Sequence, residues 1–331
     1  MSTHLPQPSL ELTQFNSLIR GPRLIILGAV HGNEVCGAQS IRRVLAEFAS
    51  GQLRIKRGQV SFVPVTNALA YAKGKREGDR NLNRDFRPAV VPLDNEDRIA
   101  NVLAPLLASH DILLDLHSFN SQGEPFIFLG PENNREELEP FKQQAEEEAF
   151  AAALGPKRVV HGWMPAFALG VSRRANDKVS YGVGTTEYMR SQGGIAVTVE
   201  CGNHADPRAP EVAYQAIHRG LRHFDLIEVC DVHGAVLSMP SVPQAKPDSM
   251  EVLELYEVID KHHLDDAFVK PWRSFDPVQA EEVIAYRAAR NGQAAQTVLA
   301  PQAGRIVFPN ANAIVGKEWF YLARISHRIL S

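Results

Sequence analysis

The sequence predicts an α/β protein with a smaller β-rich part at its C-terminal end, on three observations. Between Leu24 and about Glu228, short apolar runs alternate with longer amphipathic segments, which is typical of an α/β layer architecture. After about Cys230 the pattern changes to short alternating segments separated by turn residues, which indicates strands alone. With 331 residues the chain is long enough for two domains. We therefore expect one domain over residues 1–234 and a second over 235–331.

The first domain contains five apolar runs that we expect to be strands. Their near-continuous apolarity suits strands that helices cover on both faces. These runs are Leu24–Val30, Val60–Val65, Ile112–Leu116, Phe126–Leu129 and Ile195–Val199. Four intervening segments carry apolar residues at helical spacing or are rich in good helix formers. They are Glu34–Phe48, Asn95–Ser109, Glu136–Leu154 and Pro207–Glu228.

The second domain begins after a stretch with three prolines, Pro240–Pro247, which we interpret as a linker or irregular crossover. Short alternating segments separated by turn residues then favour strands. They are Val252–Val258, Ala267–Val269, Gly304–Phe308, Ala313–Val315 and Trp319–Ile325.

The composition is that of an ordinary globular protein, with 44% hydrophobic and 22% charged residues. A net charge of -3 gives no bulk reason to expect nucleic acid or an anionic membrane as partner. No apolar run approaches the roughly 20 residues that span a bilayer, and the N-terminus lacks a signal-peptide pattern. Three scattered cysteines do not form a disulfide framework. We therefore expect a cytoplasmic protein.

Polar side chains stand where three of the expected strands end. His31 and Glu34 follow the first, His117 follows the third, and Glu200 follows the fifth. Two imidazoles and one carboxylate make a three-ligand zinc site with an open position, and a further carboxylate would supply the base. Open α/β sheets place their ligands at such an edge. The sequence therefore predicts a metal hydrolase.

Each of these residues also has a simpler structural interpretation. The first pair could cap an exposed helix, His117 could be a satisfied core histidine, and Glu200 could be a salt-bridged strand end. Against this, Gly28 and Gly32 allow tight turns around the first pair. Asp115 projects to the same face of a strand as His117 and is a candidate to orient its imidazole. A carboxylate that closes an apolar strand, as Glu200 does, is costly unless paired or used.

The charged run from Arg76 to Phe86 is the second candidate for function. Such a run is commonly a solvated loop. However, Asn83 and Arg84 place a side-chain amide beside a guanidinium, which suits recognition of a carboxylate. Arg190 is another arginine near the predicted site, ten residues before Glu200. An acidic substrate would need groups of this kind.

These motifs together resemble the succinylglutamate desuccinylase/aspartoacylase family, the deacylase branch of the zinc-carboxypeptidase fold. They occur in the family's order and span residues 24 to about 205. They are His31-x-x-Glu34, Arg76 with Asn81–Phe86, Asp115-Leu116-His117 and Val199-Glu200-Cys201-Gly202. The trailing β segment is also similar to the one these enzymes carry. The resemblance implies a zinc-carboxypeptidase-like mixed sheet flanked by helices, with a smaller all-β C-terminal domain that shapes the site.

The resemblance also implies roles for individual residues. Three side chains would hold one Zn²⁺ per chain: His31, Glu34 and His117. Glu200 would be the general base, and Arg76 would polarise the scissile carbonyl and stabilise the oxyanion. Three residues would bind substrate carboxylates: Asn83, Arg84 and Arg190. The chain departs from the family at Asn81, where an aspartate is usual, and Ala311–Val315 lacks the family's substrate-binding tyrosine, although Tyr321 follows nearby.

The function expected from these residues is hydrolysis of the amide bond of a small N-acyl amino acid or related carboxylate-bearing compound. A metallocarboxypeptidase acting on a peptide C-terminus and an ester hydrolase are alternatives on the same site. A non-catalytic ligand-binding protein that kept the fold is a third. By resemblance the protein is also expected to form a homo-oligomer. The segment Leu299–Lys317 resembles half of a biotinyl/lipoyl-type domain without its carrier lysine, so we interpret it as a wall of the site.

Overall fold

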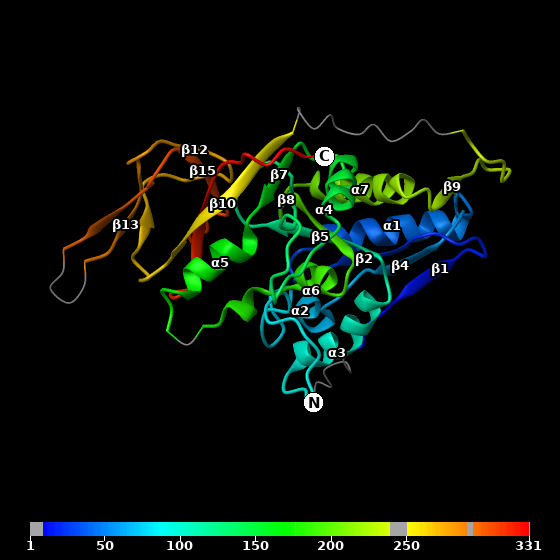
Figure 1. Cartoon of the computed structure of the whole chain (residues 1–331), viewed down its shortest axis with the longest axis horizontal. Helices are drawn as coiled ribbons and strands as arrows, with labels where there is room; N and C mark the ends of the chain where they lie inside the picture. Colours follow the sequence, from blue (N-terminus) through cyan, green and yellow to red (C-terminus); the bar gives the residue numbers. More distant parts are fainter. Residues whose placement is uncertain (1–8, 176, 239–249, 290–293, 331) are drawn as a thin grey trace.

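The computed structural model describes residues 9–175, 177–238, 250–289 and 294–330 (Figure 1). Its centre is a mixed sheet of eleven strands. In sheet order they are β1 (Thr13–Asn16), β4 (Gln59–Val63), β2 (Arg23–Gly28), β5 (Ile112–Phe119), β8 (Ile195–Asn203), β6 (Phe126–Phe128), β7 (Arg158–His161), β10 (Glu251–Asp260), β16 (Glu318–Ile325), β15 (Gly304–Val307) and β12 (Pro277–Val278). A small sheet of three strands is formed by β11 (Ala267–Phe268), β13 (Val283–Arg287) and β14 (Gln296–Leu299). A second small sheet pairs β3 (Leu53–Ile55) with β9 (Ile227–Val229).

Helices cover both faces of the α/β part of this sheet (Figure 1). One face packs against α1 (Cys36–Ser50), α4 (Gln144–Ala153) and α7 (Ala209–His223). The other face packs against α3 (Asn95–Ala108) and α6 (Thr185–Ser191). The remaining helices are α2 (Ala68–Lys73), α5 (Trp163–Val171) and the 3-10 helix η1 (Val179–Gly182).

Burial on both faces explains the continuous apolar runs of the central strands. Along β2, Leu24 and Ile26 belong to one core, whereas Ile25 and Leu27 belong to the other. Successive side chains of a strand point to opposite faces, so a strand between two helical layers needs apolar residues at every position. All eight residues of β5 are buried. The prediction of an α/β fold with a mixed sheet is therefore confirmed.

Several predicted boundaries shift, each for a local reason. Strands β5 and β8 continue past their predicted ends, because their pairing extends to Phe119 opposite Asn203. Helix α4 begins eight residues later than predicted, since Pro140 disfavours helix in the residue before it and Phe141 forms a β-bridge with Asn134. The helix predicted to run to Glu228 ends at His223, just before Asp225 adopts a left-handed backbone with φ 54°.

The C-terminal segment also differs in detail from the prediction. The strand predicted at Ala313–Val315 is wrong: these residues form a loop, with Ile314 70% exposed. The predicted linker Pro240–Pro247 lies entirely outside the described residues. Strand β10 pairs parallel with β7 and antiparallel with β16. The β-rich part therefore continues the sheet of the α/β part across the boundary predicted at 234/235.

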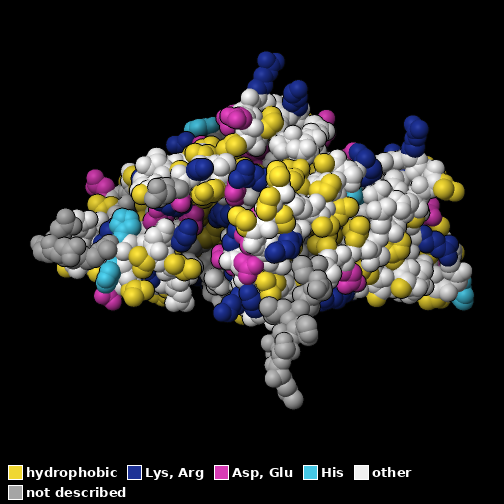
Figure 2. All heavy atoms as spheres, turned by 90° about the horizontal axis from the view of Figure 1, so that it is seen from below, with side chains coloured by type: hydrophobic (Ala, Val, Ile, Leu, Met, Phe, Trp, Pro, Cys, Tyr) yellow, Lys and Arg dark blue, Asp and Glu magenta, His cyan; other side chains and the backbone are white. Residues whose placement is uncertain are grey.

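Surface properties add two observations. On the face shown in Figure 2, Lys and Arg side chains are interspersed with Asp and Glu. That face carries no single-sign stripe of the kind that guides nucleic-acid binding. Among the described residues, no helix has both the length and the apolarity to cross a bilayer.

The central position of β5 generates a stability prediction. Leu114 is fully buried in the core under α1 and α7. Leu114→Ala is expected to lower the free energy of unfolding by about 2–5 kcal/mol, because it removes buried methyl groups and leaves a cavity. Urea denaturation measures this change. The matched control Val102→Ala, at a side chain 51% exposed on α3, should change it by less than about 0.5 kcal/mol, and equal effects would contradict the assigned core.

Candidate active site

The first two predicted ligands stand on a tight loop between β2 and α1. The loop turns by a hydrogen bond from the Glu34 backbone N–H to the His31 carbonyl oxygen. Gly32 lies so close to α2 that a Cβ there would approach the carbonyl carbon of Ala70 to 2.0 Å. Only glycine fits this approach, which fixes the loop that carries His31 and Glu34.

The other two residues come from neighbouring parallel strands. His117 lies in β5 and Glu200 in β8, and the two are register partners. Strand β2 pairs on the other side of β5, so its loop opens at the same edge of the sheet. The predicted convergence at the carboxyl edge is therefore found in the structure, although both residues lie within strands and not after them.

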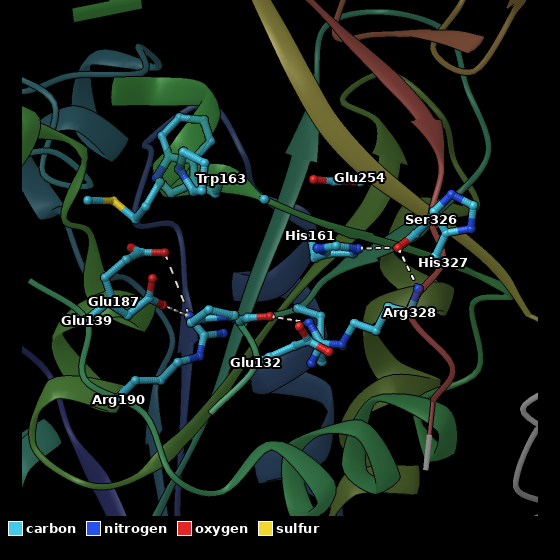
Figure 3. A pocket seen from close by; sticks show the side chains of 16 residues that line it. Glu132, Glu139, His161, Trp163, Glu187, Arg190, Glu254, Ser326, His327 and Arg328 are labelled. Carbon is cyan, nitrogen blue, oxygen red and sulfur yellow. Dashed lines mark hydrogen bonds and ion pairs between the residues drawn. The ribbon is translucent and has the colours of Figure 1, made fainter. Parts of the chain in front are cut away.

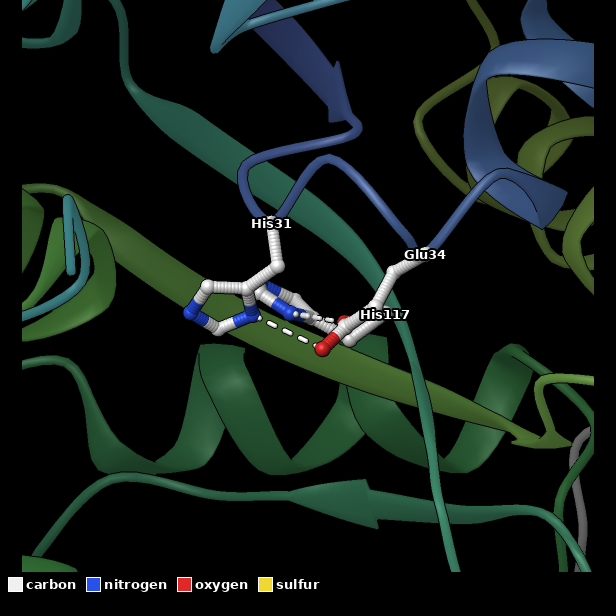
Figure 4. Close-up of side chains that lie close together, drawn as sticks. All are labelled: His31, Glu34 and His117. Atoms are coloured by element: carbon white, nitrogen blue, oxygen red, sulfur yellow. Dashed lines mark hydrogen bonds and ion pairs between the residues drawn. The ribbon is translucent and has the colours of Figure 1, made fainter. Parts of the chain in front are cut away.

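Three side chains form a compact buried group that could hold a metal (Figure 4). His31 Nδ1 lies 2.9 Å from Glu34 Oε1, and His117 Nδ1 lies 2.8 Å from Glu34 Oε2. One ligand atom from each residue lies within 4.8 Å of the other two, and each residue is at most 3% exposed. Two imidazole nitrogens and a carboxylate oxygen are the ligand types of catalytic zinc sites, so this donor set fits the ion.

The far nitrogen of each imidazole lies close to an oxygen atom of a second side chain. His117 Nε2 lies 3.1 Å from Asp115 Oδ2, the contact predicted for Asp115, and Thr185 Oγ1 donates to the same oxygen at 2.6 Å. His31 Nε2 lies 3.0 Å from Asn81 Oδ1. Such contacts leave Nδ1 of each ring available as a ligand. The sequence predicts Asn81 beside the substrate arginines, whereas in the structure its side-chain oxygen contacts a candidate ligand.

Glu200 is a buried carboxyl group in the same cavity as the three candidate ligands. It is 8% exposed, and its Oε2 has no hydrogen-bond partner among the described residues. Burial raises the pKa of Glu200 to about 8, whereas the two imidazoles hold the pKa of the buried Glu34 well below its usual range. Burying an unsatisfied carboxyl is unfavourable. A group kept in this state beside candidate ligands is available to exchange protons.

The loop that follows α2 brings three further predicted residues to the same cavity, which measures about 770 Å³. Arg76 Nη1 lies 2.8 Å from Glu34 Oε1. Asn83 Oδ1 accepts a hydrogen bond of 2.8 Å from the Thr185 backbone N–H. The Arg84 guanidinium lies 4.7 Å above the ring of Trp163. Arg76 therefore contacts a candidate ligand, and Asn83 and Arg84 line the same cavity, which suits recognition of a carboxylate.

Arg190 lies in the same wall but is held internally. Its Nε and Nη1 donate to Glu147 and Glu139 at 2.8 and 2.7 Å, and its Nη2 donates to the Ala196 carbonyl oxygen. It also lines a second cavity of about 410 Å³, where Figure 3 shows Glu139 and Glu187 directed toward it. Binding of a substrate carboxylate by Arg190 would require one of these acceptors to be released.

His204 is a cavity residue that the sequence analysis missed. Its Nδ1 lies 2.8 Å from Ser118 Oγ, and burial lowers the pKa of its imidazole. Ser118 also donates its backbone N–H to Glu34 Oε2 at 3.1 Å. The available signal was proximity, because His204 follows Glu200 by four residues.

Glu96 organises the arginine-bearing loop and was also missed. This fully buried carboxylate accepts hydrogen bonds from the backbone N–H groups of Gly78, Asp79 and Arg80, at 3.1–3.3 Å. The Asn67 side chain donates to it at 2.8 Å. A buried acceptor that satisfies several loop donors restrains the backbone between Arg76 and Asn83.

A mixed sheet covered by helices, with a group of possible metal ligands at its edge, is the arrangement of an α/β enzyme with a candidate metal site. The chain belongs to the succinylglutamate desuccinylase/aspartoacylase family, because the model of that family's catalytic domain matches residues 20–224. Members of this family are deacylase hydrolases. No curated protein matches the chain.

Solved structures share its fold. A succinylglutamate desuccinylase/aspartoacylase from Rhodobacter sphaeroides has a TM-score of 0.69 at 17% identity, over 96% of this chain and 89% of that one. The product-bound ectoine utilization protein EutE (DoeB) from Ruegeria pomeroyi has a TM-score of 0.65 at 21% identity, over 95% and 87%. An aspartoacylase family protein from Mesorhizobium loti has a TM-score of 0.65 at 20% identity, over 96% and 90%.

The Glu96 contacts generate a prediction about loop order. In Glu96→Gln an amide N–H₂ replaces one acceptor oxygen and leaves backbone donors unsatisfied, so the free energy of unfolding should fall by about 1–3 kcal/mol. We also expect KM to rise about tenfold, because the loop carries Arg84 but no candidate metal ligand. Zinc content should stay unchanged. The control is Glu124→Gln at an exposed site, and an unchanged KM in Glu96→Gln would contradict the positioning role.

Proposed function

We propose that this protein is a zinc-dependent deacylase that hydrolyses the amide bond of a small N-acyl amino acid or related carboxylate-bearing compound. The observation that carries the proposal is the meeting of His31, Glu34 and His117 with the unpartnered carboxyl of Glu200 in one cavity. Family membership supports the reaction class. The cations beside this group support a carboxylate on the substrate.

Zinc held by His31, Glu34 and His117, one ion per chain, would lower the pKa of a bound water to about 7 and polarise a carbonyl. Glu200 takes the proton from the attacking water and gives it to the leaving amine nitrogen. Arg76 donates hydrogen bonds to the carbonyl oxygen as its negative charge develops.

Positioning of the substrate completes the proposal. Arg84 pairs with the substrate carboxylate, and Asn83 donates from its amide nitrogen because its Oδ1 already accepts from Thr185. Arg190 binds the substrate carboxylate as well only if it gives up its hydrogen bond to Glu147 or Glu139. Because an ester carbonyl presents the same oxygen to Arg76 and needs the same base, ester hydrolysis is the second activity that this site supports.

Metal removal is the first test. Elemental analysis should find about one zinc per chain, and a chelator should abolish hydrolysis of N-acyl amino acids until zinc is restored. His117→Ala should lose the metal, because it removes one of three ligands. The control His233→Ala removes an exposed imidazole and should keep it. A folded protein that binds no zinc would contradict the metal assignment.

Substitution of the base is the second test. Glu200→Gln should retain one zinc per chain and lower kcat by at least about 100-fold, since it removes the proton acceptor while keeping the shape. Glu137→Gln, at an exposed position, is the matched control. Near-wild-type turnover by Glu200→Gln would show that another group is the base. No turnover by the wild-type protein on amide, ester and peptide panels would favour a non-catalytic ligand-binding protein.

A further inference from the structure

One wall of the larger cavity is built from aromatic side chains. Phe128 of β6, Trp163 of α5 and Phe308 after β15 all line it. Their rings are in contact, with centroids 6.4 Å apart for Phe128 and Trp163 and 5.9 Å apart for Phe128 and Phe308. Phe119 and Tyr321 extend the same wall at either end. We call Phe128, Trp163 and Phe308 the aromatic wall.

These three rings are not simply part of the core. Each is partly exposed, whereas Phe126 beneath them is fully buried. Partly exposed rings that line a cavity offer apolar surface to a ligand, and aromatic side chains contribute strongly to ligand burial. The three rings therefore offer contact area for an apolar group, which a small diacid lacks.

Phe308 is held in the wall by an unusual backbone conformation. Its φ is 51°, in the left-handed region that bulky residues rarely adopt. Its backbone N–H donates to Ser274 Oγ at 3.0 Å, and that hydroxyl contacts Ser121 Oγ at 2.7 Å. Residues kept in such conformations cluster at ligand sites, where the surrounding structure fixes them. The ring of Phe308 is thus placed at the cavity by its neighbours.

A cation lies directly beside the aromatic wall. The Trp163 indole is fixed by a hydrogen bond of 2.9 Å from its Nε1 to the Gly182 carbonyl oxygen, and Arg84 stacks on its face. Among the described residues, no carboxylate forms an ion pair with Arg84 within 4.0 Å, although its positive charge lowers the pKa of the Glu318 carboxyl in the same cavity. A guanidinium next to the aromatic wall suits a ligand that carries both a carboxylate and an apolar group.

The size of the cavity agrees with such a ligand. Its volume of about 770 Å³ lies in the upper part of the range of roughly 300–1,000 Å³ found for drug-sized ligands. Trp163 also lines the adjoining cavity of about 410 Å³ (Figure 3). Substrates larger than a small diacid can therefore be accommodated.

We infer that the aromatic wall is a substrate subsite for a large apolar group, so that the preferred substrates are N-acyl amino acids with an aromatic or long aliphatic acyl group or side chain. This inference rests on the proposed function. It makes Phe128, Trp163 and Phe308 specificity-determining residues and leaves the carboxylate to Arg84.

Two substrate series test the inference with zinc-loaded enzyme. In the first, the acetyl group is kept and the amino acid is glycine, aspartate or phenylalanine. In the second, glycine is kept and the acyl group is acetyl, succinyl, hexanoyl or phenylacetyl. We expect kcat/KM of an apolar member to exceed that of the acidic member at least about tenfold, and the series that responds identifies the group on the wall. Preference for acidic members in both series overturns the inference.

Variants test the named residues. Phe308→Gly removes the ring and relieves the left-handed backbone, so loss of folding is not expected. It should lower kcat/KM for the preferred apolar substrate about 10- to 100-fold more than that for N-acetylglycine. Trp163→Leu should act in the same direction. Tyr286→Ala, which removes a half-exposed ring outside the cavity, is the control. Equal losses on both substrates overturn the inference.

Binding separates this inference from the proposed function. Calorimetry on zinc-loaded Glu200→Gln measures the affinity of the same compounds without turnover. If the wild-type enzyme hydrolyses none of them yet apolar members bind at least about tenfold more tightly than acidic ones, the proposed function fails and the subsite stands. Equal or tighter binding of the acidic members overturns the subsite, whatever the turnover.

Discussion

The parallel register between β5 and β8 is the constraint on which the candidate site depends. It sets His117 opposite Glu200, and β2 on the other side of β5 delivers the loop of His31 and Glu34. A slip of one residue would turn each side chain to the other face of the sheet. Because both faces of these strands are buried under helices, core packing fixes the register. The chemistry at the sheet edge is thus set by apolar contacts far from it.

Glu34 is the carboxylate that the basic side chains of the site contact. Its two oxygens contact His31, His117 and Arg76, and the buried carboxylate is stabilised by these neighbours. The loop that carries Arg76 is ordered in the same way, since three of its backbone N–H groups donate hydrogen bonds to the buried carboxylate of Glu96. Buried carboxylates are unfavourable unless fully bonded, so each needs its partners in place. These contacts restrain the loops that carry the candidate site residues.

The C-terminal strands make a separate contribution to the site. They continue the sheet through the pairing of β10 with β7 and bring Phe308 against Phe128. The candidate ligands and base come from the α/β part alone, whereas the cavity wall is built from both parts. The candidate ligands and base therefore lie in one part of the sheet, whereas the cavity wall adds Phe308 from the other part to Phe128 and Trp163.

The sequence alone determined the α/β class, the central strands and the residues at their ends, because apolar period and strand-end position are local properties. It also placed His31, Glu34, His117 and Glu200 at one edge. Only the tertiary structure decided the partners. Asn81 contacts His31 from 50 residues away in the sequence, and Glu139 accepts a hydrogen bond from Arg190 from 51 residues away. Such contacts leave no local signal, since they depend on how loops and strands distant in the chain are brought together by the common core.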